Sequence, residues 1–184
     1  MTGESRPVSS IVPRVLASAL ALSAAAFGTW VAREGYTAKP VIPTRGDVPT
    51  IGHGSTRYED GTPVQMSDAP ITRKRAAELA WSLHEQDQQP FRASIPGVAL
   101  TQGEYDVYVD FVGQYGIGNW RASSMRRELL SGNYRKACDA LLLYRRAAGY
   151  DCSTLVNGKP NTRCYGVWER QQQRHAKCLA EQGK

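Results

Sequence analysis

The sequence predicts an α+β fold in which a small antiparallel sheet is followed by a larger helical lobe, with a hydrophobic helix in front of both. Three observations predict this: an uncharged run from Val15 to Ala32, turn residues and short β-branched patches over residues 39–66, and helical periodicity from Pro70 onward. With 184 residues, 41% hydrophobic and 22% charged, the chain has the composition of a globular domain. That composition excludes a disordered tail, a repeat array and a mostly membrane-embedded protein.

The uncharged run has the position and flanks of an export segment. Arg6 and Arg14 precede it, and its length approaches the roughly 20 residues that a helix needs to cross a bilayer. Most of its residues are Ala, Ser, Gly or Thr, which gain little from lipid. Three interpretations remain open: a signal peptide cleaved near Ala24–Ala26, a weak inner-membrane anchor that later leaves the membrane, or an Ala-rich core helix. We favour the anchor, with the amino terminus in the cytoplasm, and divide the chain into residues 1–32 and a folded domain, residues 33–184.

The cysteines also indicate export. All four lie beyond the hydrophobic run, at Cys138, Cys152, Cys164 and Cys178. Their spacing contains no Cys-x-x-Cys and no nearby His pair, so we expect no zinc site, and an even number in an exported chain indicates two disulfides. We favour Cys152–Cys164, which closes the Gly- and Pro-containing loop between them, and Cys138–Cys178, which joins two helices. Four reduced thiols in a cytosolic protein are the alternative.

The rest of the chain is mostly helical in pattern. Apolar residues recur at helical spacing in four stretches: Thr72–Gln89, the residues after Thr101, the residues after Asn133, and Trp168–Ala180. Thr101 and Glu104 have the spacing of a capping box, and Asn133 is of a residue type that caps helices. These stretches form the predicted helical lobe.

The formal net charge of +6 indicates which classes of binding partner to expect. Beyond Ala32 there are 21 basic and 16 acidic residues, so most of the excess belongs to the folded domain. Such a surface attracts nucleic acid, anionic lipid or an acidic cell wall. The chain has no nucleic-acid recognition motif, and export would remove it from the chromosome, so we expect wall and membrane surfaces and no nucleic acid. We further expect a monomer. Phosphate-binding and metal-binding motifs are missing from the sequence, so we also expect no cofactor and no metal.

Three stretches carry a family resemblance. Glu34-Gly35-Tyr36, followed by Gly46-Asp47-Val48-Pro49-Thr50-Ile51-Gly52-His53-Gly54, resembles the active-site region of phage-type lysozymes, glycoside hydrolase family 24. Phe111–Tyr134 is similar to the central helix, Gly-rich turn and following helix of that family, and Gly166–Arg170 to its carboxy-terminal signature. The weak hydrophobic run resembles the signal-anchor-release element of secreted phage endolysins. The resemblance covers nearly all of residues 33–184.

It implies a lysozyme-like fold and a definite reaction. The expected activity is that of a muramidase, which hydrolyses the β-1,4 bond between N-acetylmuramic acid and N-acetylglucosamine of peptidoglycan. The expected site of action is the periplasm, where the enzyme would be tethered to the inner membrane, then released, and would cause lysis of the host cell.

The resemblance also assigns catalytic residues, with one departure. Glu34 corresponds to the general acid that protonates the leaving oxygen, and Thr50 to a threonine that positions a water or a substrate group. The family usually has an Asp six residues before that threonine, where this chain has Thr44. Asp47 is the nearby carboxylate that could substitute as general base, although Gly46-Asp47 is also a common turn pair. Three alternatives therefore stay open. Asp47 is the general base, or Thr50 only orients the attacking group, or the enzyme has no base and is a lytic transglycosylase that works with a single Glu. A non-catalytic, membrane-anchored peptidoglycan-binding protein is the more distant alternative.

Two further residues are candidates for substrate binding. His53 lies in a Gly-His-Gly sequence and either forms hydrogen bonds near the active site or packs in the core. Gln114 stands where the family commonly has Asn, and the resemblance implies a contact with a sugar N-acetyl group.

Overall fold

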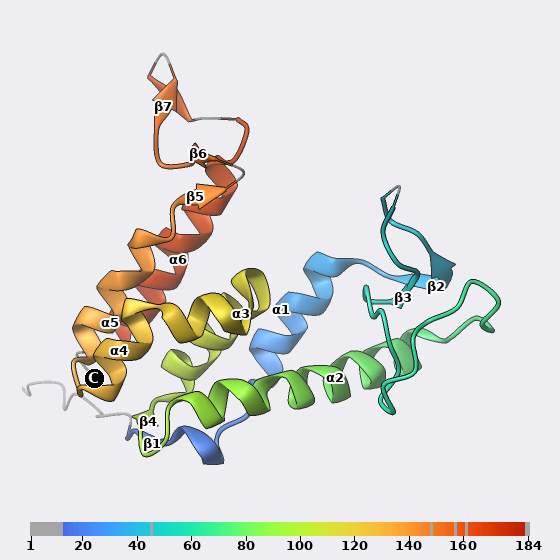
Figure 1. The fold of residues 1–184 in the computed structure, drawn as a ribbon, viewed down its shortest axis with the longest axis horizontal. Coiled ribbons are helices and arrows are strands. Elements are labelled where there is room, and N and C mark those ends of the chain that lie inside the picture. The colour runs from blue at the N-terminus through green and yellow to red at the C-terminus, as the bar shows by residue number, and fades with distance from the viewer. Residues whose placement is uncertain (1–12, 45, 148, 157, 161, 183–184) are drawn as a thin grey trace, which may run out of the picture. The chain divides into compact units, whose positions relative to one another are not determined.

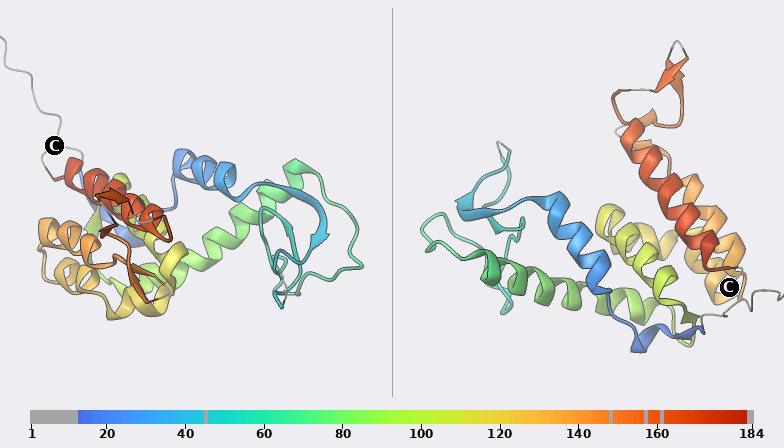
Figure 2. Two further views of the ribbon diagram at one scale, coloured as in Figure 1. Left: turned by 90° about the horizontal axis from the view of Figure 1, so that it is seen from above. Right: turned by 180° about the vertical axis from the view of Figure 1, so that it is seen from behind.

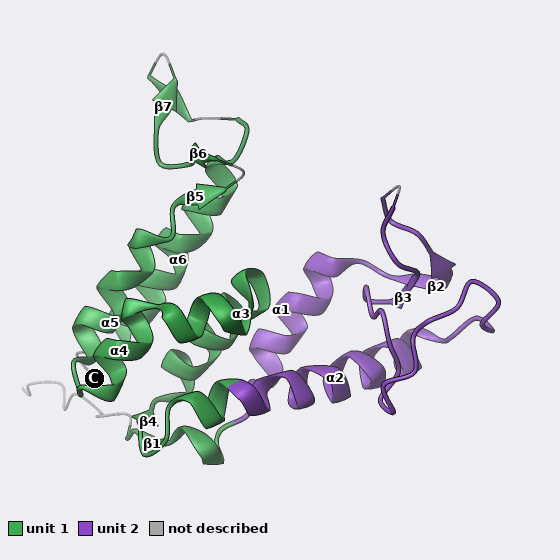
Figure 3. Ribbon diagram, in the orientation of Figure 1, with its two compact units in different colours: residues 1–20, 91–184 green, residues 21–90 purple. Residues whose placement is uncertain are grey.

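The structure, a computed structural model, describes residues 13–182 except 45, 148, 157 and 161. The fold combines helices with short antiparallel strand pairs (Figure 1), which is the predicted α+β class. The chain divides into two compact units: unit 1 contains Met1–Leu20 and Phe91–Lys184, and unit 2 contains Ala21–Pro90 (Figure 3). The hydrophobic run therefore contributes to both units.

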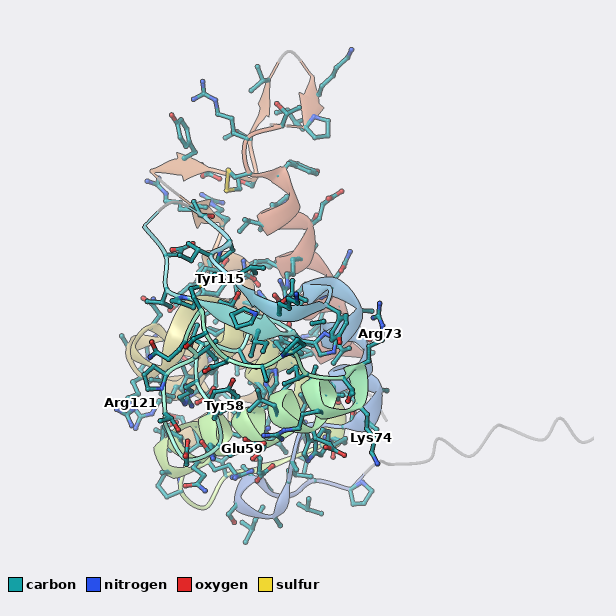
Figure 4. All side chains as sticks on the ribbon, turned by 90° about the vertical axis from the view of Figure 1, so that its right-hand side faces the viewer. Tyr58, Glu59, Arg73, Lys74, Tyr115 and Arg121 are labelled. Atoms are coloured by element: carbon teal, nitrogen blue, oxygen red, sulfur yellow. A yellow bond between two sulfur atoms is a disulfide. The ribbon has the colours of Figure 1, made fainter. Side chains whose placement is uncertain are left out.

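Unit 2 contains the small sheet. Its elements are α1 (Ala24–Glu34), the antiparallel strands β2 (Thr37–Val41) and β3 (Thr50–Gly52), and most of α2 (Arg73–Ser94). The core joins the sheet to α2 through four buried side chains: Ile51, Val64, Leu79 and Leu83. The loop after β3 is fastened to α2 by Glu59, which accepts a 2.7 Å hydrogen bond from Nη2 of Arg75; Figure 4 shows Glu59 beside this helix.

Aromatic rings join α1 to α2. Phe27 lies edge-on to Trp81 with ring centroids 4.9 Å apart, and Trp30 lies edge-on to His84 at 4.2 Å. Edge-to-face pairs of this kind add to the stability that burial alone provides. Burial among these rings lowers the pKa of His84, because an apolar setting disfavours the charged imidazolium. The neutral ring is therefore the form that packs against α1.

Unit 1 is the helical lobe. Its helices are α3 (Gln102–Ala122), α4 (Ser124–Leu130), α5 (Tyr134–Ala140) and α6 (Tyr165–Ala180), with a single helical turn at Leu141–Leu143. The predicted capping box of Thr101 and Glu104 is confirmed at the start of α3. Asn133 does occupy the N-cap of α5, but its side chain donates to Glu128 at 3.0 Å and forms no capping bond. The core is aromatic and centres on Trp120, which is fully buried and donates through Nε1 to Oγ of Ser94 at 2.8 Å.

A hairpin arm extends from the helices of unit 1. It consists of two strand pairs, β5 (Arg146–Ala147) with β6 (Tyr150–Asp151) and β7 (Leu155–Val156) with β8 (Lys159–Pro160). The arm continues beyond the start of α6 in Figure 1 and in the right-hand view of Figure 2. The Cys152–Cys164 disulfide closes it, and Cys138–Cys178 joins α5 to α6. Both pairings match those favoured from the sequence.

The hydrophobic run is helical only in its second half. Its first half forms β1 (Val15–Leu16) and a 3-10 turn (Ala17–Ala19), and the α-helix begins at Ala24. Strand β1 pairs with β4 (Ala99–Leu100), so hydrogen bonds to a distant segment replace those of a continuous helix. In the described part of the chain no helix combines the length and the apolar character needed to cross a membrane. The transmembrane helix expected from the sequence is thus not found among these residues.

Candidate active site

Glu34 is the last residue of α1. The helix begins after Ser23, whose side chain accepts a hydrogen bond from the N–H of Ala26, and it ends where Gly35 adopts φ = 72°. This left-handed conformation favours glycine, and it turns the chain sharply from the helix into β2. The Glu-Gly pair therefore has a direct structural role: it ends α1 with an exposed carboxylate at the point where the sheet begins.

The turn after β3 lies next to this carboxylate. Ile51 and Ser55 exchange backbone hydrogen bonds of 2.9 and 3.0 Å, which folds residues 51–55 into a tight loop. A Cβ atom placed on Gly54 would lie 3.9 Å from Oε2 of Glu34, which is ordinary van der Waals contact, so the carboxylate lies directly beside the loop. Gly54 also has φ = 84°, a conformation that other residues rarely adopt.

A hydrogen bond from His53 joins the turn after β3 to the end of α1. The side chain of His53 is 6% exposed, and its Nδ1–H donates to the carbonyl oxygen of Gly35. A carbonyl can only accept, so this bond assigns the proton of the neutral ring to Nδ1. His53 thus holds the backbone immediately after Glu34 against the turn that carries Gly54. The buried ring of His53 packs in the core and forms this backbone hydrogen bond, while its contact with substrate stays a prediction.

Tyr36 and Arg73 extend the same support. The ring of Tyr36 lies 5.9 Å from that of His53, and its hydroxyl donates to the carbonyl of Ile71 at 2.6 Å. The guanidinium of Arg73, labelled at the start of α2 in Figure 4, lies over the Tyr36 ring at 4.3 Å. Sequence reasoning did not assign a role to either residue. The only available signal was the position of Tyr36 directly after Glu-Gly.

The other two catalytic candidates lie farther along the β2–β3 hairpin. Thr37 pairs with Gly52 at the end that leads back to Glu34, whereas Val41 pairs with Thr50 toward the tip. The hydroxyl of half-buried Thr50 donates to the carbonyl of Val41 at 3.3 Å. Asp47 is exposed in the tip, where its N–H bonds to the carbonyl of Thr44 at 2.9 Å in a turn. Thr50 is thus nearer than Asp47 to the end of the hairpin that leads to Glu34.

Gln114 belongs to a different cluster, in unit 1. Its Oε1 accepts a 2.7 Å hydrogen bond from Nη1 of Arg174, and the same arginine donates to both the side chain and the backbone carbonyl of Asp110. Arg170 donates to the other carboxylate oxygen of Asp110 at 2.6 Å. Gln114 is therefore engaged in a charged network between α3 and α6. The described residues contain no group of His, Cys, Asp and Glu that could hold a metal ion.

Comparison with known proteins gives the family. The family model described as Phage lysozyme matches residues 23–173. The chain belongs to the phage lysozyme family. The endolysin of Salmonella phage P22 is 34% identical to this lysozyme over 125 residues, which are 67% of this chain and 82% of the relative. The residues that the family model matches, 23–173, include the Glu34 site.

Solved structures agree with this assignment. A mutant of P22 lysozyme superposes with a TM-score of 0.66 at 26% identity, covering 87% of this chain and 99% of the other. The endolysin of Escherichia coli O157:H7 phage FAHEc1 gives the same TM-score at 24% identity, with 88% and 94% covered, and shows likeness of fold. The lysozyme-like fold expected from the sequence is confirmed. The protein is a muramidase-type glycosidase with a peptidoglycan-lytic function, and neither a transglycosylase nor a non-catalytic wall-binding protein is favoured.

Proposed function

We propose that this lysozyme hydrolyses the β-1,4 bond between N-acetylmuramic acid and N-acetylglucosamine, with Glu34 as the general acid. The observation that carries the proposal is the placement of the Glu34 carboxylate: exposed at the end of α1, beside Gly54, with the adjoining backbone held by His53. Cleavage of a glycosidic bond needs a carboxylic acid fixed where it can protonate the leaving oxygen. The hydrogen bond from His53 to the carbonyl of Gly35 fixes the backbone directly after Glu34 and so supports that placement.

The second half of the reaction falls to Thr50 or Asp47. Thr50 is half-buried on a strand, and its hydroxyl can orient a water molecule or a substrate group. Asp47 has the carboxylate that a general base requires, but it is exposed in the hairpin tip. We favour Thr50 as the residue that positions the attacking water. Asp47, in the hairpin tip, would be the general base that accepts a proton from this water. His53 and Gln114 remain the candidates for contacts with the sugar.

Muropeptide analysis tests both assignments. Purified peptidoglycan is digested with the full chain and with Glu34→Gln, and the products are identified by mass spectrometry. Glu78→Gln is the matched control, because Glu78 is an exposed carboxylate of α2 in the same unit. Reducing N-acetylmuramic acid ends that disappear in Glu34→Gln but not in Glu78→Gln support the proposal. Anhydro ends would identify a transglycosylase instead, and unchanged activity of Glu34→Gln would reject Glu34 as the acid.

We also propose that the lysozyme reaches the periplasm of the host by way of its hydrophobic run, is held at the inner membrane as a monomer, and lyses the host after release. The supporting features are the basic flank of Arg14, the apolar run itself and the two disulfides, which form in oxidising compartments. Membrane fractionation over the time course of lysis tests this. A lysozyme that moves from the membrane to the soluble periplasmic fraction before lysis supports tethering. If a cleavable signal replaces residues 15–32 and the timing of lysis does not change, tethering is wrong.

A further inference from the structure

The first half of the hydrophobic run lies in a docking site on unit 1. Strand β1 pairs with β4 in the register Val15 to Leu100 and Leu16 to Ala99, and the N–H of Ala17 continues the pairing with Val98 at 2.9 Å. The side chain of Ala17 is 1% exposed. This segment is therefore part of the folded unit and is held by its backbone and by the buried side chain of Ala17.

A buried carboxylate marks the end of this docking site. Glu104 of α3 is 1% exposed, and it receives two hydrogen bonds from Arg14: Nε to Oε2 at 3.0 Å and Nη2 to Oε1 at 2.7 Å. The planar guanidinium and the carboxylate thus form a bidentate ion pair, the geometry in which such pairs are strongest. The same guanidinium lies 3.9 Å from the ring centroid of Tyr134 and donates to Oε1 of Gln182 at 3.0 Å. Four different contacts therefore hold one side chain.

The remaining partners of Glu104 are neutral. The N–H of Thr101 donates to Oε2 at 2.9 Å, and the amide of Gln182 donates to Oε1 at 2.6 Å. In the part of the chain that the structure describes, the positive charge at this carboxylate comes from Arg14. A buried carboxylate that loses its cation is strongly destabilising, because neutral donors do not replace the missing charge. Arg14 itself is 31% exposed, so it can leave the site without unfolding the helices around it.

We propose that Glu104, Tyr134 and Gln182 form a guanidinium-binding site for Arg14, and that unit 1 is fully stable only when the amino-terminal segment occupies this site. The site fits an arginine side chain because it combines the two acceptor oxygens of the Glu104 carboxylate, the face of the Tyr134 ring and the amide oxygen of Gln182. Arg14, which occupies this site, is also the basic residue directly before the hydrophobic run.

Tethering as proposed above would keep Arg14 away from this site and so regulate the stability of unit 1. While the run is in the membrane, Arg14 is on the cytoplasmic side and cannot reach Glu104 in the periplasm. Unit 1 would then have a buried, unpaired carboxylate until the segment leaves the bilayer. A chain cleaved near Ala24–Ala26 would lack Arg14 permanently, so full stability of the released enzyme requires the uncleaved chain.

The docking site is tested on the purified full chain by unfolding and by hydrogen exchange. Arg14→Ala should raise the unfolded fraction of unit 1 about a hundredfold and should increase the exchange of the amides of Ala17 and Leu100. The stability and amide exchange of Arg14→Lys should lie between those of the wild type and those of Arg14→Ala, because lysine keeps the positive charge but cannot form the bidentate pair. Arg135→Ala is the matched control: it removes an exposed arginine adjacent to Tyr134 and should change neither quantity.

Chemical rescue separates recognition from a general loss of stability. Guanidinium chloride, at concentrations far below those that unfold proteins, should raise the midpoint of Arg14→Ala more than sodium chloride of equal ionic strength does. It should not raise the midpoint of the wild type or of Arg135→Ala. If Arg14→Ala has the stability and exchange of Arg135→Ala, or is not rescued by guanidinium, the site is not a guanidinium receptor.

The failure of docking and the failure of tethering give different results. Loss of stability in purified Arg14→Ala supports docking whether or not the lysozyme is ever found in membrane fractions. If docking is supported but the wild-type chain never fractionates with membranes, the regulatory consequence is wrong and the binding site stands. If Arg14→Ala is as stable as the wild type, docking is wrong even where tethering is observed.

Discussion

Arg174 of α6 and Asp110 of α3 form an ion pair of 2.7 Å in which the arginine side chain is only 3% exposed. Arg170 forms a second ion pair with the same carboxylate at 2.6 Å. Burial alone would raise the pKa of Asp110, but hydrogen bonding from Arg170 and the charge of Arg174 hold that pKa below its usual value. The pair therefore ties α3 to α6 through a carboxylate that must stay ionised.

Asp110→Asn should destabilise unit 1 and reduce its sensitivity to acid. At neutral pH we expect a loss of about 3 kcal/mol in the free energy of unfolding, because Arg174 stays buried without its counterion. A carboxylate whose pKa is lowered by folding contributes stability above its unfolded pKa, about 3.9, and this contribution is lost as pH falls through the folded value. Urea unfolding between pH 7 and acid should therefore show a shallower acid-induced decline in the variant. Glu169→Gln, an exposed carboxylate of α6, is the control and should follow the wild type.

The two disulfides should contribute unequally to stability. Cys138 and Cys178 are 40 residues apart in sequence, and Cys152 and Cys164 are 12 apart. In the chain-entropy model the longer loop gives about 4 kcal/mol and the shorter about 3 kcal/mol. The first bond also joins α5 to α6, whereas the second closes the hairpin arm. Replacing Cys138 and Cys178 together by Ala should lower the thermal midpoint more than replacing the other pair, as measured by calorimetry. The opposite order would mean that the arm stabilises the helices.

The predictable parts of the fold are those encoded locally. The capping box at Thr101 and Glu104 follows from residues three positions apart, and the start of α3 was predicted correctly from it. By contrast, the pairing of β1 with β4 joins residues more than 80 positions apart, and so the run after Arg14 was expected to be a continuous helix. Tertiary hydrogen bonds outweigh the helix propensity of its alanines there. The strands of the arm are too short to have a periodic pattern.

The candidate site divides in the same way. Glu34 and Thr50 came from a resemblance of short motifs, and the structure adds how the first is supported. The bond from His53 to Gly35 could not be predicted, because its acceptor is a backbone carbonyl that no sequence pattern marks. The ion pair of Arg14 with Glu104 is also not predictable from the sequence, because its partners are 90 positions apart and the local pattern at Glu104 indicates only the cap.

Gly52 should tolerate substitution poorly. It has φ = 68°, and a Cβ atom there would lie 2.9 Å from the Cβ of Ala76 on α2. Gly52→Ala therefore combines backbone strain with a steric clash between the sheet and the helix, and we expect a loss of about 2–3 kcal/mol in unfolding free energy. Gly61→Ala is the control for strain alone, because Gly61 has φ = 87° with open space around it. Denaturant unfolding should show the larger loss for Gly52→Ala. Equal losses would mean that α2 shifts to accommodate the methyl group.

His53 should act on catalysis through the backbone that follows Glu34. Removal of the Nδ1–H bond in His53→Ala frees the carbonyl of Gly35, and a displaced carboxylic acid protonates the leaving oxygen less well. We expect kcat on purified peptidoglycan to fall about tenfold to a hundredfold, with a smaller change in KM. His53→Asn places an amide N–H near the position of Nδ1, so it should recover most of the lost kcat. Thermal unfolding of both variants distinguishes positioning from folding. If His53→Asn is as inactive as His53→Ala while both remain folded, the site requires the imidazole itself, and His53 would then be a substrate contact rather than a support for Glu34.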